Sequence, residues 1–251
     1  MTETAQLADV VLPVASFAEK DGTFSNTERR VQRVRKAVEA PGEAKADWEV
    51  ICGISNKMGY AMKYSSAKEI FEEVAKVTPS YAGISYERLE KGGIQWPCPT
   101  KDHPGTKFLH KDKFSRGLGL FSAIEYIAPN ELPDKQYPFL LSTGRVLYHY
   151  HTGTMTTKAE GLNERCPESL VEINPADADK LKIAEGQKVK VTSRRGAVEA
   201  KATITKKSAP GSIFMNFHFA DASVNLLTNP ALDPIGKIPE YKVCAVKVEA
   251  A

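Results

Sequence analysis

The second half of the chain alternates apolar and polar residues in short runs that end at tight turns. The turn Arg194-Arg195-Gly196, for example, separates one such run at 188–193 from another at 197–205. Alternation with a period of two is the pattern of a strand that buries one face. The predicted strands are 138–141, 169–173, 188–193, 197–205, 212–219 and 243–248. Many short strands with tight turns favour a compact β-barrel.

Three helices are predicted from apolar spacing and capping residues. The first spans Asp47–Met58, with Asp47 in the N-cap position. The second opens at the capping box Ser66–Glu69 and stops before Pro79. The third is brief and follows Asn174-Pro175, which match an N-cap and a first helical residue. The chain is therefore predicted to mix α and β structure.

The first half contains fewer strand signals. The apolar run Ala8–Pro13 predicts one buried strand, yet a strand at a chain start needs neighbours, and no obvious ones follow. The segment Asn26–Lys36 carries five cations; it fits a solvated strand or helix, or a nucleic-acid patch without interleaved aromatics. Prolines forbid regular structure across 92–105. We place the domain boundary between about Pro104 and Glu131 and divide the chain into 1–115 and 116–251.

The stretch 137–158, with the sequence YPFLLSTGRVLYHYHTGTMTTK, is the candidate binding site. An apolar run ends in Gly144 and Arg145, and an aromatic and histidine cluster follows before several threonines. Arginine offers a planar fork to phosphate, and hydroxyls and backbone N–H groups near glycine can approach phosphate oxygens closely. The pattern is suited to a large anionic ligand.

Two other interpretations of this stretch stay open. A loop rich in Thr and Gly after a strand is common without any function. His149 and His151 would share one face of a strand and could form a metal pair, although no Cys or His completes a zinc site at short spacing.

Composition bounds the function. The chain has 251 residues, 42% of them hydrophobic and 26% charged, as in ordinary globular proteins. A net charge of +3 fits anionic small ligands and does not argue for nucleic acid. No apolar run is long enough for a membrane span, and no signal peptide is visible. The four cysteines form no CxxC motif, so we expect free thiols in a reducing cytoplasm.

Motifs along nearly the whole chain match one family. They are TETAQLADVVLPVASFAEKDGTFSNTERRVQR, IQWPCP, LSTGRVLYHYHTGTMT, the DADKL…G…V.V.SRRG unit and NLLTNPALDP…PEYKVCAVKVE. They run in family order from about Thr2 to Glu249. The chain resembles the C-terminal part of the molybdopterin-dependent oxidoreductases, and most closely of the formate dehydrogenase catalytic (alpha) subunit.

The resemblance implies a fold and a cofactor. Residues 116–251 look like a double-psi β-barrel, the molybdopterin dinucleotide-binding domain, and 1–115 like the end of an incomplete α/β domain plus a helical connection. The cofactor implied is bis(molybdopterin guanine dinucleotide) with Mo or W. The family's iron–sulfur cysteines, metal-ligating Cys or selenocysteine and catalytic His would lie in an upstream part or partner chain. Since Met1 directly precedes the first motif, we expect a split gene, a fragment or such a partner.

The resemblance also assigns cofactor-binding residues, and no catalytic or metal-ligating ones. Arg145 would bind cofactor phosphate or pterin. Asp47 is similar to the family aspartate that binds guanine, since a carboxylate can accept two hydrogen bonds from the guanine edge; its rival role is the N-cap, and both can hold together. The remaining residues would line or approach the pterin: His149, His151, Thr152, His218, Asn225, Tyr241 and Lys242.

Three functions follow as hypotheses. The first is the cofactor-binding portion of a formate dehydrogenase, which oxidises formate to CO₂ and passes two electrons to an iron–sulfur centre. The second is a non-catalytic module that stores, carries or inspects the pterin cofactor. The third is part of a related oxidoreductase that uses nitrate or another oxyanion.

Overall fold

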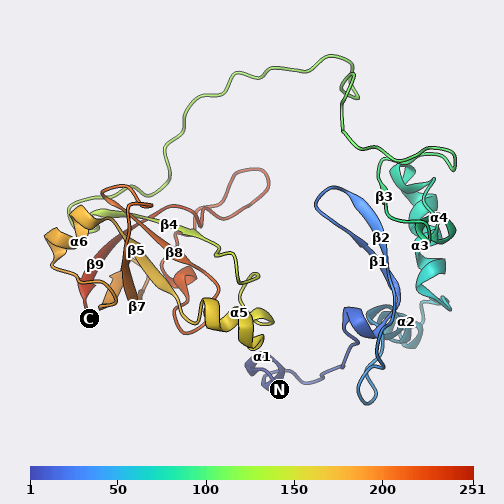
Figure 1. The fold of residues 1–251 in the computed structure, drawn as a ribbon, viewed down its shortest axis with the longest axis horizontal. Helices are drawn as coiled ribbons and strands as arrows, with labels where there is room; N and C mark the ends of the chain where they lie inside the picture. The colour runs from blue at the N-terminus through green and yellow to red at the C-terminus, as the bar shows by residue number, and fades with distance from the viewer. The chain divides into compact units, whose positions relative to one another are not determined.

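The computed structural model describes all 251 residues as two compact units, Met1–Ser122 and Ala123–Ala251 (Figure 1). The first unit combines a small sheet with helices, and the second is dominated by strands. No helix in either unit combines the length and the apolar character that crossing a membrane requires.

The sheet of the first unit has three short antiparallel strands in the order β1-β2-β3. Their bounds are β1 Gly22–Ser25, β2 Arg30–Val34 and β3 Ile94–Gln95. Val31 lies opposite Ile94 across the β2/β3 pair, and both side chains are buried. The two-residue strand β3 lies in the proline-rich stretch that the sequence analysis treats as a loop, so that expectation is wrong at this point.

The first unit has four short helices, of which the last two contribute to a small apolar core. The helices are α1 Glu3–Gln6, α2 Asp47–Lys57, α3 Ala67–Val77 and α4 Tyr86–Leu89, with 3₁₀ turns η1 Phe17–Glu19 and η2 Pro79–Tyr81. The Ser66 hydroxyl accepts the Glu69 N–H at 3.3 Å, and α3 ends two residues before Pro79, as predicted. The core residues are Val31, Phe71, Ile84, Tyr86, Leu89, Ile94 and Cys98.

Two expectations for this unit are wrong. The run Ala8–Pro13 forms no strand, and Val10 is 73% exposed, because its surroundings offer only an isolated bridge from Val14 to Lys45. Asp47 is not the N-cap of α2: Ala46 holds that position, and Asp47 is the first helical residue.

The basic segment 26–36 folds as the turn into β2 and the strand itself. Four of its five cations lie against carboxylates, which cancel much of the positive field, and Arg29 donates to backbone carbonyls instead. Arg30 pairs with Glu28, and Arg33 and Arg35 both pair with Glu90. The solvated-strand interpretation therefore fits this segment better than a nucleic-acid patch.

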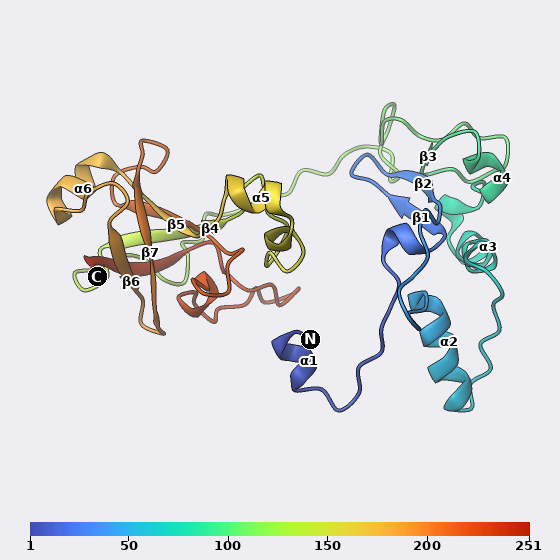
Figure 2. The ribbon, with the colours of Figure 1, turned by 60° about the horizontal axis from the view of Figure 1, so that its bottom comes forward.

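A closed six-stranded barrel forms the second unit, with strand order β4-β8-β5-β7-β6-β9 (Figures 1 and 2). The bounds are β4 Phe139–Gly144, β5 Leu170–Ile173, β6 Lys188–Thr192, β7 Ala197–Ile204, β8 Ser212–Asn216 and β9 Cys244–Ala250. The pairs β4/β8 and β5/β7 are parallel, and the other neighbours are antiparallel. The barrel and the mixed α and β fold class predicted from sequence are confirmed.

Alternation along the strands builds the barrel core. Val189 and Val191 of β6 are fully buried, whereas Lys188 and Lys190, which alternate with them, face solvent. Leu141, Ile173, Ile213, Met215 and Val246 contribute from other strands. Apolar burial of this kind stabilises a fold by roughly 25 cal/mol per Å² of surface removed from water.

Short helical segments connect the strands. They are η3 Thr156–Lys158, α5 Glu160–Arg165, α6 Pro175–Leu181 and η4 Val224–Leu226. The predicted cap of α6 is confirmed, since the Asn174 side chain accepts the Ala176 N–H at 3.0 Å and Pro175 follows it. The predicted hairpin is also confirmed: β6 and β7 pair across a turn that Ser193 N–H and Gly196 C=O close at 2.9 Å.

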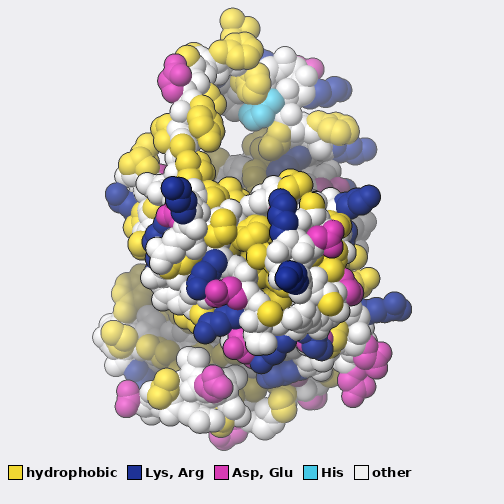
Figure 3. All heavy atoms as spheres, turned by 90° about the vertical axis from the view of Figure 1, so that its left-hand side faces the viewer, with side chains coloured by type: hydrophobic (Ala, Val, Ile, Leu, Met, Phe, Trp, Pro, Cys, Tyr) yellow, Lys and Arg dark blue, Asp and Glu magenta, His cyan; other side chains and the backbone are white.

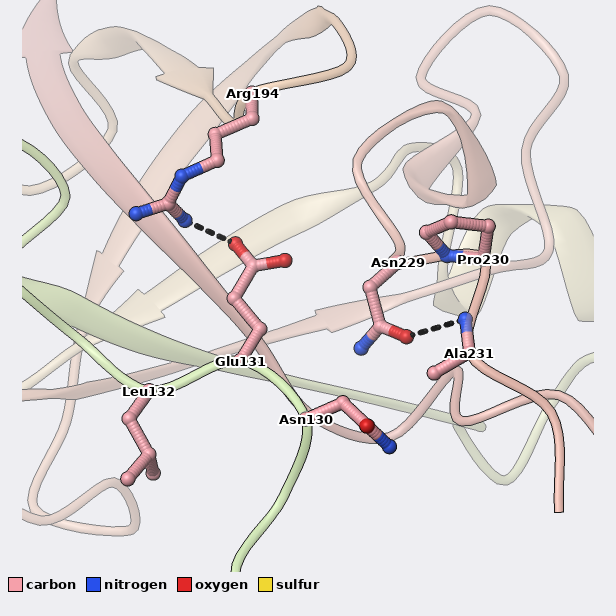
Figure 4. A pocket seen from close by; sticks show the side chains of 7 residues that line it. All are labelled: Asn130, Glu131, Leu132, Arg194, Asn229, Pro230 and Ala231. Atoms are coloured by element: carbon pink, nitrogen blue, oxygen red, sulfur yellow. Dashed lines mark hydrogen bonds and ion pairs between the residues drawn. The ribbon is translucent and has the colours of Figure 1, made fainter.

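The Glu131 carboxylate connects the segment before β4 to the β6–β7 turn and to β9. Glu131 accepts hydrogen bonds from Arg194, from Arg195 and from the Ala245 N–H, the last at 3.1 Å. It lines an open pocket of about 490 Å³ together with Arg194 and Asn229 (Figure 4). Burial alone would raise the pKa of Glu131, but the hydrogen bonds from Arg195 and Ala245 outweigh it and lower the pKa.

We expect Glu131→Gln to lower the free energy of unfolding by about 1–3 kcal/mol at neutral pH, because it leaves Arg195 without a carboxylate and removes one of the two carboxylates that pair with Arg194. Since the native pKa is lowered, this stabilisation is present above the ordinary pKa of 4.5 and is lost as pH falls through the native value. Denaturant unfolding at pH 7 and at pH 3 measures both effects. Glu168→Gln, which breaks only an exposed pair with Lys201, is the control; an equal loss in both variants would contradict the anchoring role.

Candidate functional site

The candidate site forms where the parallel strands β4 and β8 end together. Gly144, the last residue of β4, lies opposite Asn216, the last residue of β8. The Phe217 N–H then donates to the Gly144 carbonyl at 3.2 Å. Because parallel strands end at the same edge of a sheet, the residues that follow each strand come together. Arg145 and Phe217 are thereby brought side by side.

Two cations flank the half-buried ring of Phe217. The guanidinium carbon of Arg145 lies 5.3 Å from the ring centroid, and the Lys242 ammonium lies 5.9 Å from it. Both distances are within the range of cation–π contacts. Neither cation has a carboxylate within ion-pair distance, unlike Arg194 and Arg195 on the same barrel. An anionic group here would meet two cations that no carboxylate neutralises.

The segment before β9 is fixed against β4 by backbone contacts. The Thr143 hydroxyl donates to the Tyr241 carbonyl at 2.6 Å, and the Lys242 ammonium donates to the Thr143 carbonyl at 2.9 Å. Asn229 supports this segment from the other side, since its amide donates to the carbonyls of Glu240 at 3.3 Å and Val243 at 2.8 Å. Tyr241 and Lys242 therefore meet the end of β4, where Arg145 follows.

His218 is buried behind this cluster, and its ring uses both nitrogens within the protein. Nε2 accepts the Val146 N–H at 2.9 Å, and Nδ1 donates to the His151 carbonyl. This pair of contacts requires a neutral ring with its hydrogen on Nδ1. Burial lowers the pKa of His218 and outweighs the hydrogen bond to the His151 carbonyl, which raises it; the charges of His149, Arg145 and His151 lower the pKa further.

His149, which is expected to line the pterin, is also buried. Its Nε2 lies 2.6 Å from the Cys166 carbonyl, and its Nδ1 lies 3.0 Å from the Thr156 hydroxyl. Its ring is 5.7 Å from that of His218. Because β4 ends at Gly144 and residues 149–151 lie in a loop outside any strand, the strand geometry that a His149–His151 metal pair requires is missing.

His151 and Thr152 lie at the exposed tip of the same loop. His151 adopts a left-handed backbone with φ of 46°, and its side chain is exposed. The Thr152 hydroxyl lies 3.4 Å from that of Thr154. Both side chains are therefore accessible to a ligand.

Two expected site residues lie apart from these contacts. Asn225 is exposed on η4 rather than on a strand, next to a segment that Arg195 holds through the Leu227 carbonyl at 2.7 Å. Asp47 belongs to the first unit, where its carboxylate pairs with Lys20. That hydrogen bond lowers the pKa of Asp47, so the group is an anion at neutral pH.

Asn229 and Glu131 are contributors that sequence reasoning missed. Both act on segments far along the chain, Asn229 on 240–243 and Glu131 on Ala245. The dipeptide Asn229-Pro230 indicates only a local turn, and Glu131 is one acidic residue among many. No local pattern reveals such long-range partners.

The arrangement can bind an anion and a flat ring, and it carries no general acid–base pair. Two free cations suit phosphate, and exposed hydroxyls can bond to polar ring edges. The two buried histidines, His149 and His218, have both ring nitrogens engaged in hydrogen bonds within the protein. These residues fit a phosphate-bearing, ring-containing cofactor.

We expect Gly153→Ala to destabilise the barrel unit by about 1–3 kcal/mol, because φ is 73° there. An added Cβ would also lie 2.5 Å from the His218 carbonyl oxygen. Gly161→Ala in α5 is the matched control, since a Cβ there meets nothing within 4 Å and alanine favours a helix. Denaturant unfolding of both variants tests this, and equal stability would show that the loop does not need glycine at 153.

Both units of the chain are similar to known proteins. Residues 1–57 match the family model "Molybdopterin oxidoreductase", and residues 139–245 match "Molydopterin dinucleotide binding domain". Over 99% of its length the chain is 57% identical to the F420-dependent formate dehydrogenase subunit alpha of Methanocaldococcus jannaschii. It is 40% identical, again over 99%, to the assimilatory nitrate reductase catalytic subunit of Bacillus subtilis. These matches cover 38% and 37% of the two relatives.

A solved structure also matches. The fold resembles acetylene hydratase from Pelobacter acetylenicus, with a TM-score of 0.70, 18% sequence identity, and coverage of 100% of this chain and 39% of that one. At this identity the likeness concerns the fold alone. With both family models and the close relatives in agreement, the chain belongs to the molybdopterin oxidoreductases, and its barrel unit is a molybdopterin dinucleotide-binding domain.

Proposed function

We propose that this chain is the C-terminal cofactor-binding portion of a formate dehydrogenase. The complete enzyme would oxidise formate to CO₂ and pass two electrons to an iron–sulfur centre. The identities of 57%, 54% and 53% to three formate dehydrogenase alpha subunits support this assignment. The chain spans less than two fifths of the length of these relatives, so the activity belongs to the larger assembly.

The observation that carries the proposal is the pair of unneutralised cations, Arg145 and Lys242, around Phe217. Charge-assisted hydrogen bonds from such cations to phosphate are about twice as strong as neutral ones. We propose that they hold an anionic part of bis(molybdopterin guanine dinucleotide). In this proposal 116–251 is the binding domain, and 1–115 is the end of an α/β domain with a helical connection.

The other site residues take different places in the proposal. Tyr241, His151 and Thr152 are exposed near the same loops and would contact the cofactor directly. His149 and His218 would act from behind, because their rings bond to the loop backbone and to Thr156. Asn225 would bind the cofactor from its position on η4.

Asp47 would bind the guanine base through its carboxylate, since Lys20 keeps that group charged. The helix α2 does not require the Asp47 side chain as its cap, because Glu49 accepts the Ala46 N–H at 2.9 Å. The Asp47 carboxylate oxygen that does not pair with Lys20 is therefore available to a ligand.

The chemistry would depend on groups outside this chain. When bound, a pterin-held Mo or W supplies the two-electron redox chemistry, and the protein binds and orients it. A further part of the subunit or a partner chain would bring the metal ligand and the iron–sulfur cysteines. We place the protein in the cytoplasm, which the four free cysteines support.

Two alternatives remain distinguishable. The 40% identity to a nitrate reductase catalytic subunit favours a related oxyanion-using enzyme as the second candidate. A stand-alone pterin-binding module is the third. Purification from the native cell, with metal and pterin analysis of the complex, separates a stand-alone module from an enzyme part. Assays of that complex with formate and with nitrate then decide the substrate.

We expect Arg145→Ala and Lys242→Ala each to weaken cofactor retention in the assembled enzyme by ten- to a hundred-fold. The reason is that a hydrogen bond to a charged group contributes about 1.5–3 kcal/mol. Pterin content after dialysis is the measurement. Lys206→Ala removes an exposed cation far along the chain from this cluster and serves as the control; retention unchanged in all three variants would contradict the site.

The chain by itself should show no formate-dependent dye reduction, even with metal and pterin supplied. Its sequence has no CxxC motif, and the structure contains no cluster of three or more His, Cys, Asp or Glu side chains that could hold a metal. The assay compares the purified chain with the native complex at equal cofactor content. Turnover by the chain alone would show that it carries chemistry that the proposal assigns elsewhere.

A further inference from the structure

We propose that His218 is a positioning residue whose neutral ring clamps the loop 145–153, and that protonation of this ring releases the loop. The inference deepens the proposed function, since this loop begins with Arg145. It rests on where the two ring nitrogens lie, and it can be tested without the cofactor.

The clamp joins two points of one loop to a single ring. Nε2 accepts the N–H of Val146, the residue directly after Arg145, at 2.9 Å. Nδ1 donates to the carbonyl of His151 at the tip of the loop. The loop backbone is thus tied at its start and at its tip, with the ring only 1% exposed.

Packing around the ring leaves little room for another arrangement. The His218 carbonyl faces Gly153, where a Cβ would lie 2.5 Å away. The ring contacts Phe217 at 5.1 Å and His149 at 5.7 Å between centroids. The guanidinium of Arg145 lies over the same Phe217 ring, so Phe217 contacts both His218 and Arg145.

Only the neutral Nδ1–H tautomer satisfies both contacts. A proton on Nε2 would turn the acceptor for Val146 N–H into a second donor facing a donor. The titratable or charged groups around the ring are Arg145, His149 and His151 on the loop. Their charges disfavour the charged form of His218, whereas the hydrogen bond to the His151 carbonyl favours it, and burial outweighs that bond. No carboxylate is among the groups that shift it.

The direction of the pH effect follows from these contacts. Burial lowers the pKa of His218 below the ordinary 6.5, so the unfolded or opened loop takes up the proton more readily than the closed one. Closure is therefore fully stabilised above pH 6.5. It is weakened as pH falls through the lower pKa of the closed form.

Two variants separate the two ring contacts. In His218→Gln the side-chain oxygen reaches the position of Nε2 and can still accept the Val146 N–H. In His218→Asn the amide reaches only the position of Nδ1, and the Val146 N–H loses its partner. His110→Gln, at an exposed histidine in the other unit, is the control for changing a histidine as such.

The experiment is NMR on the full chain. Long-range ¹H–¹⁵N spectra should show the Nδ1–H tautomer of His218 at pH 7.5. The hydrogen-exchange protection factor of the Val146 amide should fall about tenfold or more in His218→Asn, and far less in His218→Gln and His110→Gln. In the wild type, the protection factor of the Val146 amide should fall when the pH is lowered from 7.5 to 5.

Chemical-shift titration with inorganic pyrophosphate then links the clamp to the anion site. We expect weaker binding in His218→Asn than in His218→Gln. An Nε2–H tautomer, or Val146 protection that is equal in both variants and at both pH values, would overturn the clamp even if His218→Asn proved unstable. If the Val146 protection factors change as expected but pyrophosphate causes no chemical-shift changes, the result would count against the proposed anion site and not against the clamp.

Discussion

The parallel pairing of β4 with β8 is the constraint on which the candidate site depends. It aligns Gly144 with Asn216, so that the loop after one strand and the short segment after the other leave the barrel side by side. Residues 72 positions apart, Val146 and His218, can then share a hydrogen bond. The same edge receives the segment before β9, through Thr143 and the Tyr241 carbonyl. An antiparallel partner at this position would have put the end of its strand at the opposite edge.

Arg145 and Lys242 differ from the barrel cations that have carboxylate partners. Arg194 and Arg195 share Glu131, and Lys188 and Lys201 each have a carboxylate partner. The face in Figure 3 accordingly shows Lys and Arg side chains interspersed with Asp and Glu. Arg145 and Lys242 have an aromatic ring and a backbone carbonyl in place of a carboxylate. Cations held this way keep their charge available to an external anion, because a π face and a carbonyl dipole neutralise less than a full negative charge does.

The sequence predicts the barrel better than the site, for a physical reason. Alternation in 188–193 and 197–205 reports directly on which side chains are buried, so the hairpin and its neighbours follow from local pattern. The cap at Asn174 is local as well, because donor and acceptor lie two residues apart. The strand expected at Ala8–Pro13 fails since strand formation depends on partners that a local pattern cannot supply. The N-cap of α2 fails by a single residue, the usual uncertainty at a helix end.

Histidine illustrates why residue type alone is a poor guide to chemistry. In the sequence His149, His151 and His218 read alike, as polar groups beside a ligand. In the structure, the rings of His149 and His218 are buried and form hydrogen bonds to the protein with both nitrogens. The ring of His151 is exposed, and this residue contributes to the clamp only through its backbone carbonyl. The buried pair could serve in proton transfer only by giving up a hydrogen bond, and a buried polar group left unpaired costs about 1–3 kcal/mol. In the proposed function, this edge of the barrel holds a ligand in place, with the neutral ring of His218 fixing the loop and the cations Arg145 and Lys242 meeting the anion.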